Sequence, residues 1–308
     1  MIVLSLFDGV SCGRLALERA GITVTKYYAS EIDNYAIQIA QKNYPDTIQL
    51  GDINNWMGWD IEQPDLIIGG SPCQGFSIAG KRLAFDDPRS KLFFKFVEII
   101  EFYQPKYFLL ENVKMRKEHI DVISQNLGVD PVCINSALVS AQNRVRYYWT
   151  NIPGVTQPED KNIYLKDIIE NGAVDKDKSY CIDANYWKGG NLKSYFEKHR
   201  RQLVFNLKSE NKRVHNVSID ERGIRPYQDG KKRSGLFEFG RIAFDTARKL
   251  TPIECERLQT IPDNYTQSVS NTQRYKTIGN AWTVDVIAHI FKDLKQQKDA
   301  NHDDTISR

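Results

Sequence analysis

The fold class is decided by residues 2–13, which read Ile2-Val3-Leu4-Ser5-Leu6-Phe7-Asp8-Gly9-Val10-Ser11-Cys12-Gly13. Residues 2–6 have the composition of a buried β-strand, and a helical pattern over residues 14–20 follows the glycines. Glycines at a strand-to-helix turn let backbone N–H groups approach a ligand closely, and a helix N-terminus favours a carboxylate or phosphate. The turn lacks the G-x-G-x-x-G spacing, so by itself it fits a tight turn as well as a cofactor loop.

Short β-type runs and helical patterns alternate along the first 150 residues. We predict strands over residues 2–6, 25–30, 47–50, 65–68, 107–110, 132–135 and 146–150, and helices over 14–20, 33–43, 91–103 and 118–127. This alternation predicts an α/β fold with a mostly parallel, doubly wound sheet and helices on both faces. In such a sheet, ligands bind beyond the carboxyl ends of the strands.

The periodicity weakens between residues 151 and 249, where turn signals such as Pro153-Gly154 and Asn171-Gly172 multiply. We predict a smaller, irregular, β-rich lobe there. Helical patterns return over residues 252–259 and 284–295, and the polar residues from Lys298 onward are expected to fray. The predicted organisation is a catalytic domain over residues 1–155 and 250–308, with the lobe over residues 156–249.

The composition limits the classes of protein that need to be considered. Of 308 residues, 41% are hydrophobic and 26% charged, which predicts a sizeable core rather than disorder. No apolar run approaches the ~18 residues of a membrane span, and no signal-peptide pattern follows Met1. The five cysteines are far apart and form no C-x-x-C, which argues against a disulfide framework or a zinc site. We therefore expect a cytoplasmic protein with no metal and no membrane partner.

Positive charge is concentrated in one segment of the chain. The formal net charge is only +3, but residues 186–249 contain 16 Lys/Arg against 7 Asp/Glu, a net charge of +9. Residues 1–185 carry −5 and residues 250–308 carry −1. A segment this basic is expected of a surface that meets a polyanion, and a solvated Lys/Arg-rich face is the alternative.

Reactive and acidic side chains follow the predicted strands. Glu31 and Asp52 stand after the second and third strands, where a carboxylate can accept hydrogen bonds from ribose hydroxyls or an adenine amino group. Together with the glycine turn they predict a nucleoside-type cofactor. Cys73 lies in a Gly/Pro-rich loop after the fourth strand, the place expected of an exposed nucleophilic thiolate. Glu111 ends the fifth strand at the same edge, where a carboxyl group must be paired or act as an acid.

The run Gln142-Asn143-Arg144-Val145-Arg146 adds two cations to this edge. Alternate residues of a strand point to the same side, so both guanidinium groups can face a phosphate or a polarised carbonyl.

In this order the motifs resemble those of the cytosine-specific DNA methyltransferases, which make 5-methylcytosine. Within that family they most resemble the phage or bacterial orphan enzymes and the animal de novo enzymes. The resemblance covers the whole chain. It rests on Phe7-Asp8-Gly9 with Gly13, on the acids Glu31 and Asp52, on Pro72-Cys73-Gln74, on Glu111-Asn112-Val113, on Gln142, Arg144 and Arg146 as Q-x-R-x-R, on the segment from Arg248 to Gln259, and on Gly279-Asn280-Ala281 followed by Trp282.

The resemblance implies a Rossmann-like class I methyltransferase fold with a target-recognition lobe. It implies S-adenosyl-L-methionine as cofactor, S-adenosyl-L-homocysteine as product and double-stranded DNA as partner. Cys73 would add to carbon 6 of a flipped cytosine, and Glu111 would protonate or hydrogen-bond ring N3. Arg144 would hold the base carbonyl or a flanking phosphate and help to orient Glu111, while Arg146 would support the loop.

The resemblance also assigns two further sets of residues. The cofactor set is Phe7, Asp8, Gly9, Gly13, Glu31, Ile32, Asp52, Ile53, Pro72, Asn280, Ala281 and Trp282. The DNA-binding set is Gln74, Ser77, Lys81, Arg82, Arg89, Lys231, Lys232 and Arg233. A monomer is the expected state. Two alternatives stay open: the same chemistry on a structured RNA of the transfer-RNA type, and a catalytically inactive DNA-binding homologue. The DNA sequence recognised is not predicted.

Overall fold

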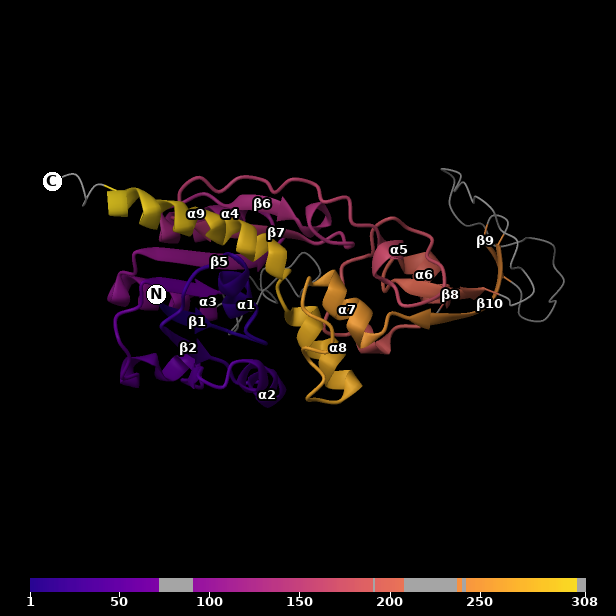
Figure 1. Ribbon diagram of the computed structural model, residues 1–308, viewed down its shortest axis with the longest axis horizontal. Coiled ribbons are helices and arrows are strands. Elements are labelled where there is room, and N and C mark those ends of the chain that lie inside the picture. Colours follow the sequence, from indigo (N-terminus) through magenta and orange to yellow (C-terminus); the bar gives the residue numbers. More distant parts are fainter. Residues whose placement is uncertain (72–90, 191, 208–236, 240–241, 304–308) are drawn as a thin grey trace.

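A seven-stranded sheet forms the larger part of the fold (Figure 1). The computed structural model describes residues 1–71, 91–190, 192–207, 237–239 and 242–303. The strand order is β3 (Ile48–Gln49), β2 (Lys26–Ser30), β1 (Ile2–Leu6), β4 (Leu66–Gly69), β5 (Tyr107–Val113), β7 (Val145–Thr150) and β6 (Val132–Asn135). The first five pair in parallel, and β7 runs antiparallel to both β5 and β6. The predicted α/β class with a mostly parallel sheet is confirmed.

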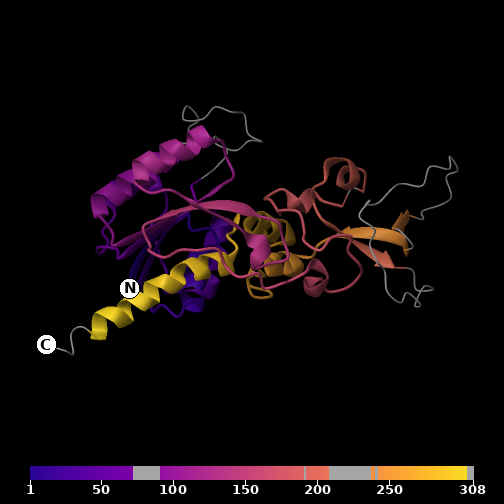
Figure 2. The same ribbon diagram turned by 90° about the horizontal axis from the view of Figure 1, so that it is seen from above.

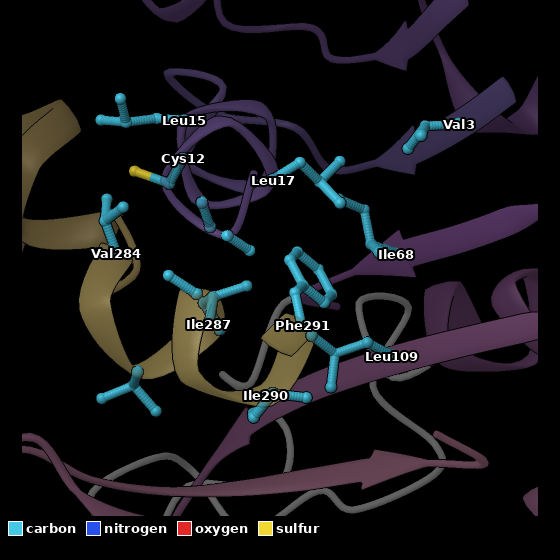
Figure 3. Close-up of a cluster of buried hydrophobic side chains, with 14 of the residues drawn as sticks. Val3, Cys12, Leu15, Leu17, Ile68, Leu109, Val284, Ile287, Ile290 and Phe291 are labelled. Atoms are coloured by element: carbon cyan, nitrogen blue, oxygen red, sulfur yellow. The ribbon is translucent and has the colours of Figure 1, made fainter. Parts of the chain in front are cut away.

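Strand alternation divides the hydrophobic core between the two faces of the sheet. Val3 and Ile68 pack with α1 (Cys12–Arg19) and α9 (Val284–Asp303), as Figure 3 shows. Their neighbours Leu4 and Ile67 pack on the opposite face with α3 (Lys91–Tyr103) and α4 (Lys117–Leu127). Figure 2 shows α9 in yellow on one side of the sheet and the magenta helices on the other. Side chains of successive strand residues point to opposite faces, so apolar runs such as β1 are buried on both.

Most of the predicted helices of the first half are present with small shifts of boundary. The helix α2 (Asn34–Asn43) begins after Asp33, whose side chain accepts the Tyr35 N–H, and α3 has the predicted bounds. The helix α4 ends at Gly128, which adopts the left-handed conformation. A 3₁₀ helix, η1 (Ile53–Gly58), follows β3, and another, η3 (Ser136–Leu138), follows β6.

The C-terminal third departs from prediction in two places. The helix α9 continues to Asp303, beyond the predicted end at residue 295, and the fraying of the last residues stays a prediction. The helix α8 (Asn271–Asn280) was not predicted, because its sequence carries few apolar residues in a helical pattern. The helix α7 (Pro252–Leu258) was predicted, and Thr251 and Glu254 close a reciprocal capping box at its start.

A second, smaller sheet lies at the far end of the molecule from α9 (Figure 1). It is antiparallel, in the order β8 (Leu203–Leu207), β10 (Ile242–Lys249) and β9 (Phe237–Phe239). The short helices α5 (Leu165–Ile168), α6 (Leu192–Lys198) and 3₁₀ helix η4 (Tyr186–Lys188) accompany it. Figure 1 shows α7 and α8 between the two sheets. Among the described residues, no helix is long and apolar enough to cross a membrane.

Candidate active site

The turn after β1 has an unusual backbone. Phe7, Gly9 and Ser11 have φ angles of 59°, 61° and 61°, a left-handed conformation that residues other than glycine rarely adopt. The Gly9 N–H donates to Glu31 Oε2 at 2.8 Å, so this bond joins the turn to the end of β2. At Gly13 a Cβ would lie 2.2 Å from Ile68 Cδ1 on β4, so any larger residue would force the end of that side chain to move. The lack of a side chain at Gly13 lets α1 approach the sheet closely.

Asp8 supports this turn from the interior. Its carboxyl group accepts hydrogen bonds from Ser11 Oγ at 2.5 Å and from the Tyr27 hydroxyl at 2.8 Å. Burial raises the pKa of Asp8 to about 6, and these hydrogen bonds oppose the rise. Asp8 is expected to contact a cofactor, which stays a prediction, and its side chain is bonded within the core.

The carboxyl ends of β2 and β3 carry two acids that the backbone holds in place. Glu31 Oε1 accepts the N–H groups of Ile32 and Asp33 at 2.7 and 2.8 Å. Asp52 Oδ1 accepts the Asn54 N–H at 2.9 Å. Ile32 is 72% exposed, an unusual position for an isoleucine, whereas Ile53 is buried. Two fixed carboxylates with an exposed apolar side chain beside a glycine turn fit a nucleoside, which offers hydroxyls, a base edge and an apolar ring.

Glu111 is almost buried, and both of its carboxyl oxygens have side-chain partners. The Arg146 Nε lies 2.8 Å from Oε1 in an ion pair whose side chains are 13% and 11% exposed. The Trp282 Nε1 donates to Oε2 at 3.2 Å. Glu111 lies on β5 and Arg146 on β7, and Trp282 follows α8, so three elements meet at this carboxyl group. Trp282 was predicted only as a cofactor residue, and no sequence signal indicated its bond to Glu111.

Arg144 has a different place from the one predicted. It is buried, and its guanidinium donates to the carbonyls of Ile182 and Ala281 at 2.9 Å each and to Cys181 Sγ at 3.3 Å. Arg146, and not Arg144 as expected, therefore makes the contact with Glu111, while the expected contact of Arg144 with a base carbonyl or phosphate stays a prediction. Arg144 joins the strand edge to the segment that leads into the smaller sheet.

Gln142 and the residues at the end of α8 lie around Arg144, where the sheet edge meets α7 and α8. Gln142 Nε2 donates to the Leu258 carbonyl at 2.7 Å and to Gln259 Oε1 at 2.8 Å. Ala281 is buried and Asn280 is exposed. A Cβ on Gly279 would lie 2.2 Å from the carbonyl carbon of Asp183, so only glycine permits α8 to meet this backbone.

The segment that follows β4 lies outside the described residues, and with it Pro72, Cys73, Gln74, Ser77, Lys81, Arg82 and Arg89. Lys231, Lys232 and Arg233 lie outside them too. The last described residue before Cys73 is the buried Ser71, whose Oγ is 3.2 Å from Asn112 Nδ2. Asn112 follows Glu111 directly, so the chain enters the Cys73 segment beside the acid. Among the described residues, no group of three or more His, Cys, Asp or Glu could hold a metal ion.

Comparisons with known proteins bear on this geometry. A family model described as C-5 cytosine-specific DNA methylase matches residues 1–296. A type II methyltransferase of Lactococcus lactis subsp. cremoris, M1.ScrFI, is 33% identical, with 95% of this chain and 77% of that protein covered. Another, M.NlaX of Neisseria lactamica, is 31% identical over 95% of this chain and 96% of that protein.

Solved structures agree on the fold. A mutant of the Spodoptera frugiperda protein DNMT2 superposes with a TM-score of 0.62 at 18% identity, with 95% of this chain and 98% of that chain covered. At this identity the likeness concerns the fold alone, and the fold is that of a methyltransferase: a Rossmann-like α/β sheet with a smaller lobe.

Proposed function

The chain belongs to the C-5 cytosine-specific DNA methylase family, and from that premise we propose that it methylates carbon 5 of a flipped cytosine in duplex DNA through a covalent bond to Cys73. It is an enzyme of the DNA (cytosine-5-)-methyltransferase class. The observation that carries the proposal is the Glu111 carboxyl group, fixed by Arg146 and Trp282 beside the strand that leads to Cys73.

The cofactor of the proposed reaction is S-adenosyl-L-methionine. It would be held by the turn at Gly9, by Glu31 and Asp52, and by the exposed Ile32. It would supply the methyl group, which leaves a sulfonium sulfur as carbon 5 attacks and so gives S-adenosyl-L-homocysteine. The fit rests on the two backbone-anchored carboxylates at neighbouring strand ends.

The chain's own residues would activate the base. Carbon 5 of cytosine is a poor nucleophile, and addition of the Cys73 thiolate at carbon 6 converts the ring to an enamine. Glu111 would hydrogen-bond or protonate ring N3 and so accept the electron density that this addition displaces. After methyl transfer, loss of the carbon 5 proton and departure of Cys73 restore the aromatic ring. Attack from above the ring requires the base to leave the duplex stack.

The substrate and surroundings follow from the same proposal. Double-stranded DNA would contact the basic residues of the lobe over 156–249, and the enzyme would act as a monomer. Its bacterial relatives favour the cytoplasm of a prokaryotic or phage-infected cell as its place of action.

Methyl transfer from labelled cofactor to duplex DNA and to bulk transfer RNA tests the proposal. The DNA should come from a host without cytosine methylation, and bisulfite mapping of the product would give the recognised sequence. We expect label in DNA with the wild type and none with Cys73→Ala, which should still bind DNA because the thiol is a small part of the interface. Duplex with 5-fluorocytosine at the mapped site should trap the wild type, because the carbon 5 proton cannot leave.

The other outcomes identify the alternatives. Label in transfer RNA alone would establish the RNA-directed reaction. DNA binding without label in either nucleic acid would establish an inactive homologue. An active wild type that 5-fluorocytosine does not trap would remove Cys73 from the mechanism.

A further inference from the structure

Trp282 spans the distance between the glycine turn and the acid. Its Cζ3 lies 3.5 Å from the position of a Cβ on Gly13, in the first turn of α1, while its Nε1 is 3.2 Å from Glu111 Oε2. Gly70, directly after β4, lies beside both the indole and the carboxyl group. A Cβ at this position would lie 2.9 Å from the Trp282 Nε1 and 3.2 Å from Glu111 Oε2. Any larger residue at position 70 would therefore force the indole or the carboxyl group to move.

The two oxygens of Glu111 have partners of different kinds. Arg146 provides a charged partner for Oε1, and Trp282 provides a neutral N–H for Oε2. The terminal torsion of a glutamate has a broad, roughly two-fold energy profile, so one partner alone leaves the carboxyl plane free to rotate. A second donor on the other oxygen restricts that rotation.

We propose that Trp282 is a positioning residue for the methyl transfer, because its indole N–H sets the plane in which the Glu111 carboxyl group meets the cytosine. The inference rests on the proposed function. Groups held in place before the reaction avoid reorganisation during it, and the benefit therefore appears in the rate of the chemical step rather than in binding. Leu, Val and Phe fill space at this position without an N–H, so they cannot replace this contribution.

Trp282→Phe keeps an aromatic ring and removes the N–H. With cofactor and mapped DNA both saturating, the single-turnover rate of methyl transfer should fall about three- to ten-fold, the range expected for one hydrogen bond. Cofactor affinity, measured separately by calorimetry, should fall by a smaller factor than the rate, since an aromatic ring remains beside α1. This division between rate and binding would not result from a general loss of structure.

Trp149→Phe is the matched control. The Trp149 Nε1 donates to Ser124 Oγ at 3.0 Å, within the core on the opposite face of β7 from Arg146. The substitution removes, from a fully buried tryptophan, an indole hydrogen bond of 3.0 Å, similar in length to the 3.2 Å bond of Trp282. It should lower the melting temperature at least as much as Trp282→Phe and leave the single-turnover rate within about two-fold of the wild type.

Two further variants distinguish positioning from packing. Gly70→Ala places a methyl group against both the indole and the carboxyl group, so one of them must shift, and it should also slow the reaction although the N–H is retained. In a Glu111→Gln background, which lowers the rate by itself, Trp282→Phe should add less than a two-fold effect, because partners in one interaction are not additive.

The inference is overturned if Trp282→Phe reacts at the wild-type rate, or if its effect is the same in the Glu111→Gln background as in the wild type. Both comparisons are made with a wild-type enzyme that is active on DNA. A wild type that transfers no methyl group to DNA would refute the proposed function and this inference with it.

Discussion

The carboxyl edge of the seven-stranded sheet and the three-stranded sheet β8-β10-β9 differ in how their polar groups are held. At the edge, acids stand at strand ends and each has at least one fixed partner: Glu31 bonds backbone N–H groups, and Glu111 bonds Arg146 and Trp282. In the described part of the smaller sheet and its surroundings, Val204 and Phe205 pack in two separate clusters, and polar contacts such as Gln202 with Asp175 and Asn206 with Thr246 join side chains to one another. Regular strands hold catalytic side chains in fixed positions. Binding to the phosphates of a polyanion depends more on the charge of a side chain than on its exact position.

The two regions also carry opposite charge. Residues 1–185 have a net charge of −5 and residues 186–249 one of +9. Substitutions at the sheet edge should therefore change rate, cofactor affinity or stability with little dependence on salt. Substitutions in the basic segment should change the salt dependence of DNA binding and leave the rate at saturating DNA unchanged.

The largest effect is expected for Arg146→Met. The ion pair with Glu111 is mostly buried, and loss of one partner from a buried pair costs about 3–5 kcal/mol. If this cost falls on the transition state, the single-turnover rate of methyl transfer falls at least 100-fold, since about 1.4 kcal/mol is a factor of ten. The melting temperature should fall as well, because a mostly buried ion pair is broken, but less than in Arg144→Met, which loses several buried hydrogen bonds.

Arg144→Met is the control for Arg146→Met and should have the reverse balance. It removes bonds to the Ile182 and Ala281 carbonyls, which join the sheet edge to the segment leading to the smaller sheet. We expect a clear fall in melting temperature. Equal loss of rate in both variants, with equal stability, would contradict the separate tasks given to the two arginines.

Asp8→Asn should change the pH dependence of stability. The folded pKa of about 6 lies above the ordinary value of 3.8, so the folded state binds the proton more tightly than the unfolded chain. The stability due to Asp8 is therefore full below about pH 4 and is lost as the pH rises through 6. At pH 8 the charged, buried carboxylate costs up to about 3 kcal/mol, at 1.36 kcal/mol for each pKa unit.

Unfolding in urea at pH 4.5 and pH 8 measures this effect. The wild type should lose more stability between the two values than Asp8→Asn does, and the variant should be the more stable at pH 8. Parallel pH profiles would show that Asp8 is not the buried titrating group.

Glu31→Ala should weaken S-adenosyl-L-methionine binding by about 1–3 kcal/mol, the scale for charged hydrogen bonds. Because Glu31 also accepts the Gly9, Ile32 and Asp33 N–H groups, part of this loss arises from a looser turn. Glu31→Gln keeps an acceptor for that turn and should bind the cofactor better than Glu31→Ala. Calorimetry that finds wild-type affinity for Glu31→Ala would remove Glu31 from the cofactor site.

Sequence patterns predicted the elements whose signal is local. The strands and helices of the first half follow apolar periodicity and caps such as Asp33, and the acids follow from their places in the strand pattern, Glu31 directly after β2 and Glu111 near the end of β5. Contacts between distant segments were not predictable in this way. Arg144 and Arg146 are two residues apart on one side of the chain, and only the packing of residues 181–182 and 281–282 decides which of them meets Glu111.

The smallest effect is expected for the triple substitution of Lys231, Lys232 and Arg233 by Ala, outside the described residues. If these residues bind phosphates, DNA binding weakens for all sequences, and the slope of log affinity against log salt flattens by about 0.9 for each phosphate that is no longer neutralised. Fluorescence anisotropy over a salt series measures the slope. Lys106→Ala combined with Lys292→Ala removes exposed cations before β5 and on α9 and should leave it unchanged. A solvated turn at 231–233 predicts no change in either quantity. That result would move the phosphate-binding role to Lys81, Arg82 and Arg89. The positive charge at residues 231–233 would then have no part in DNA binding.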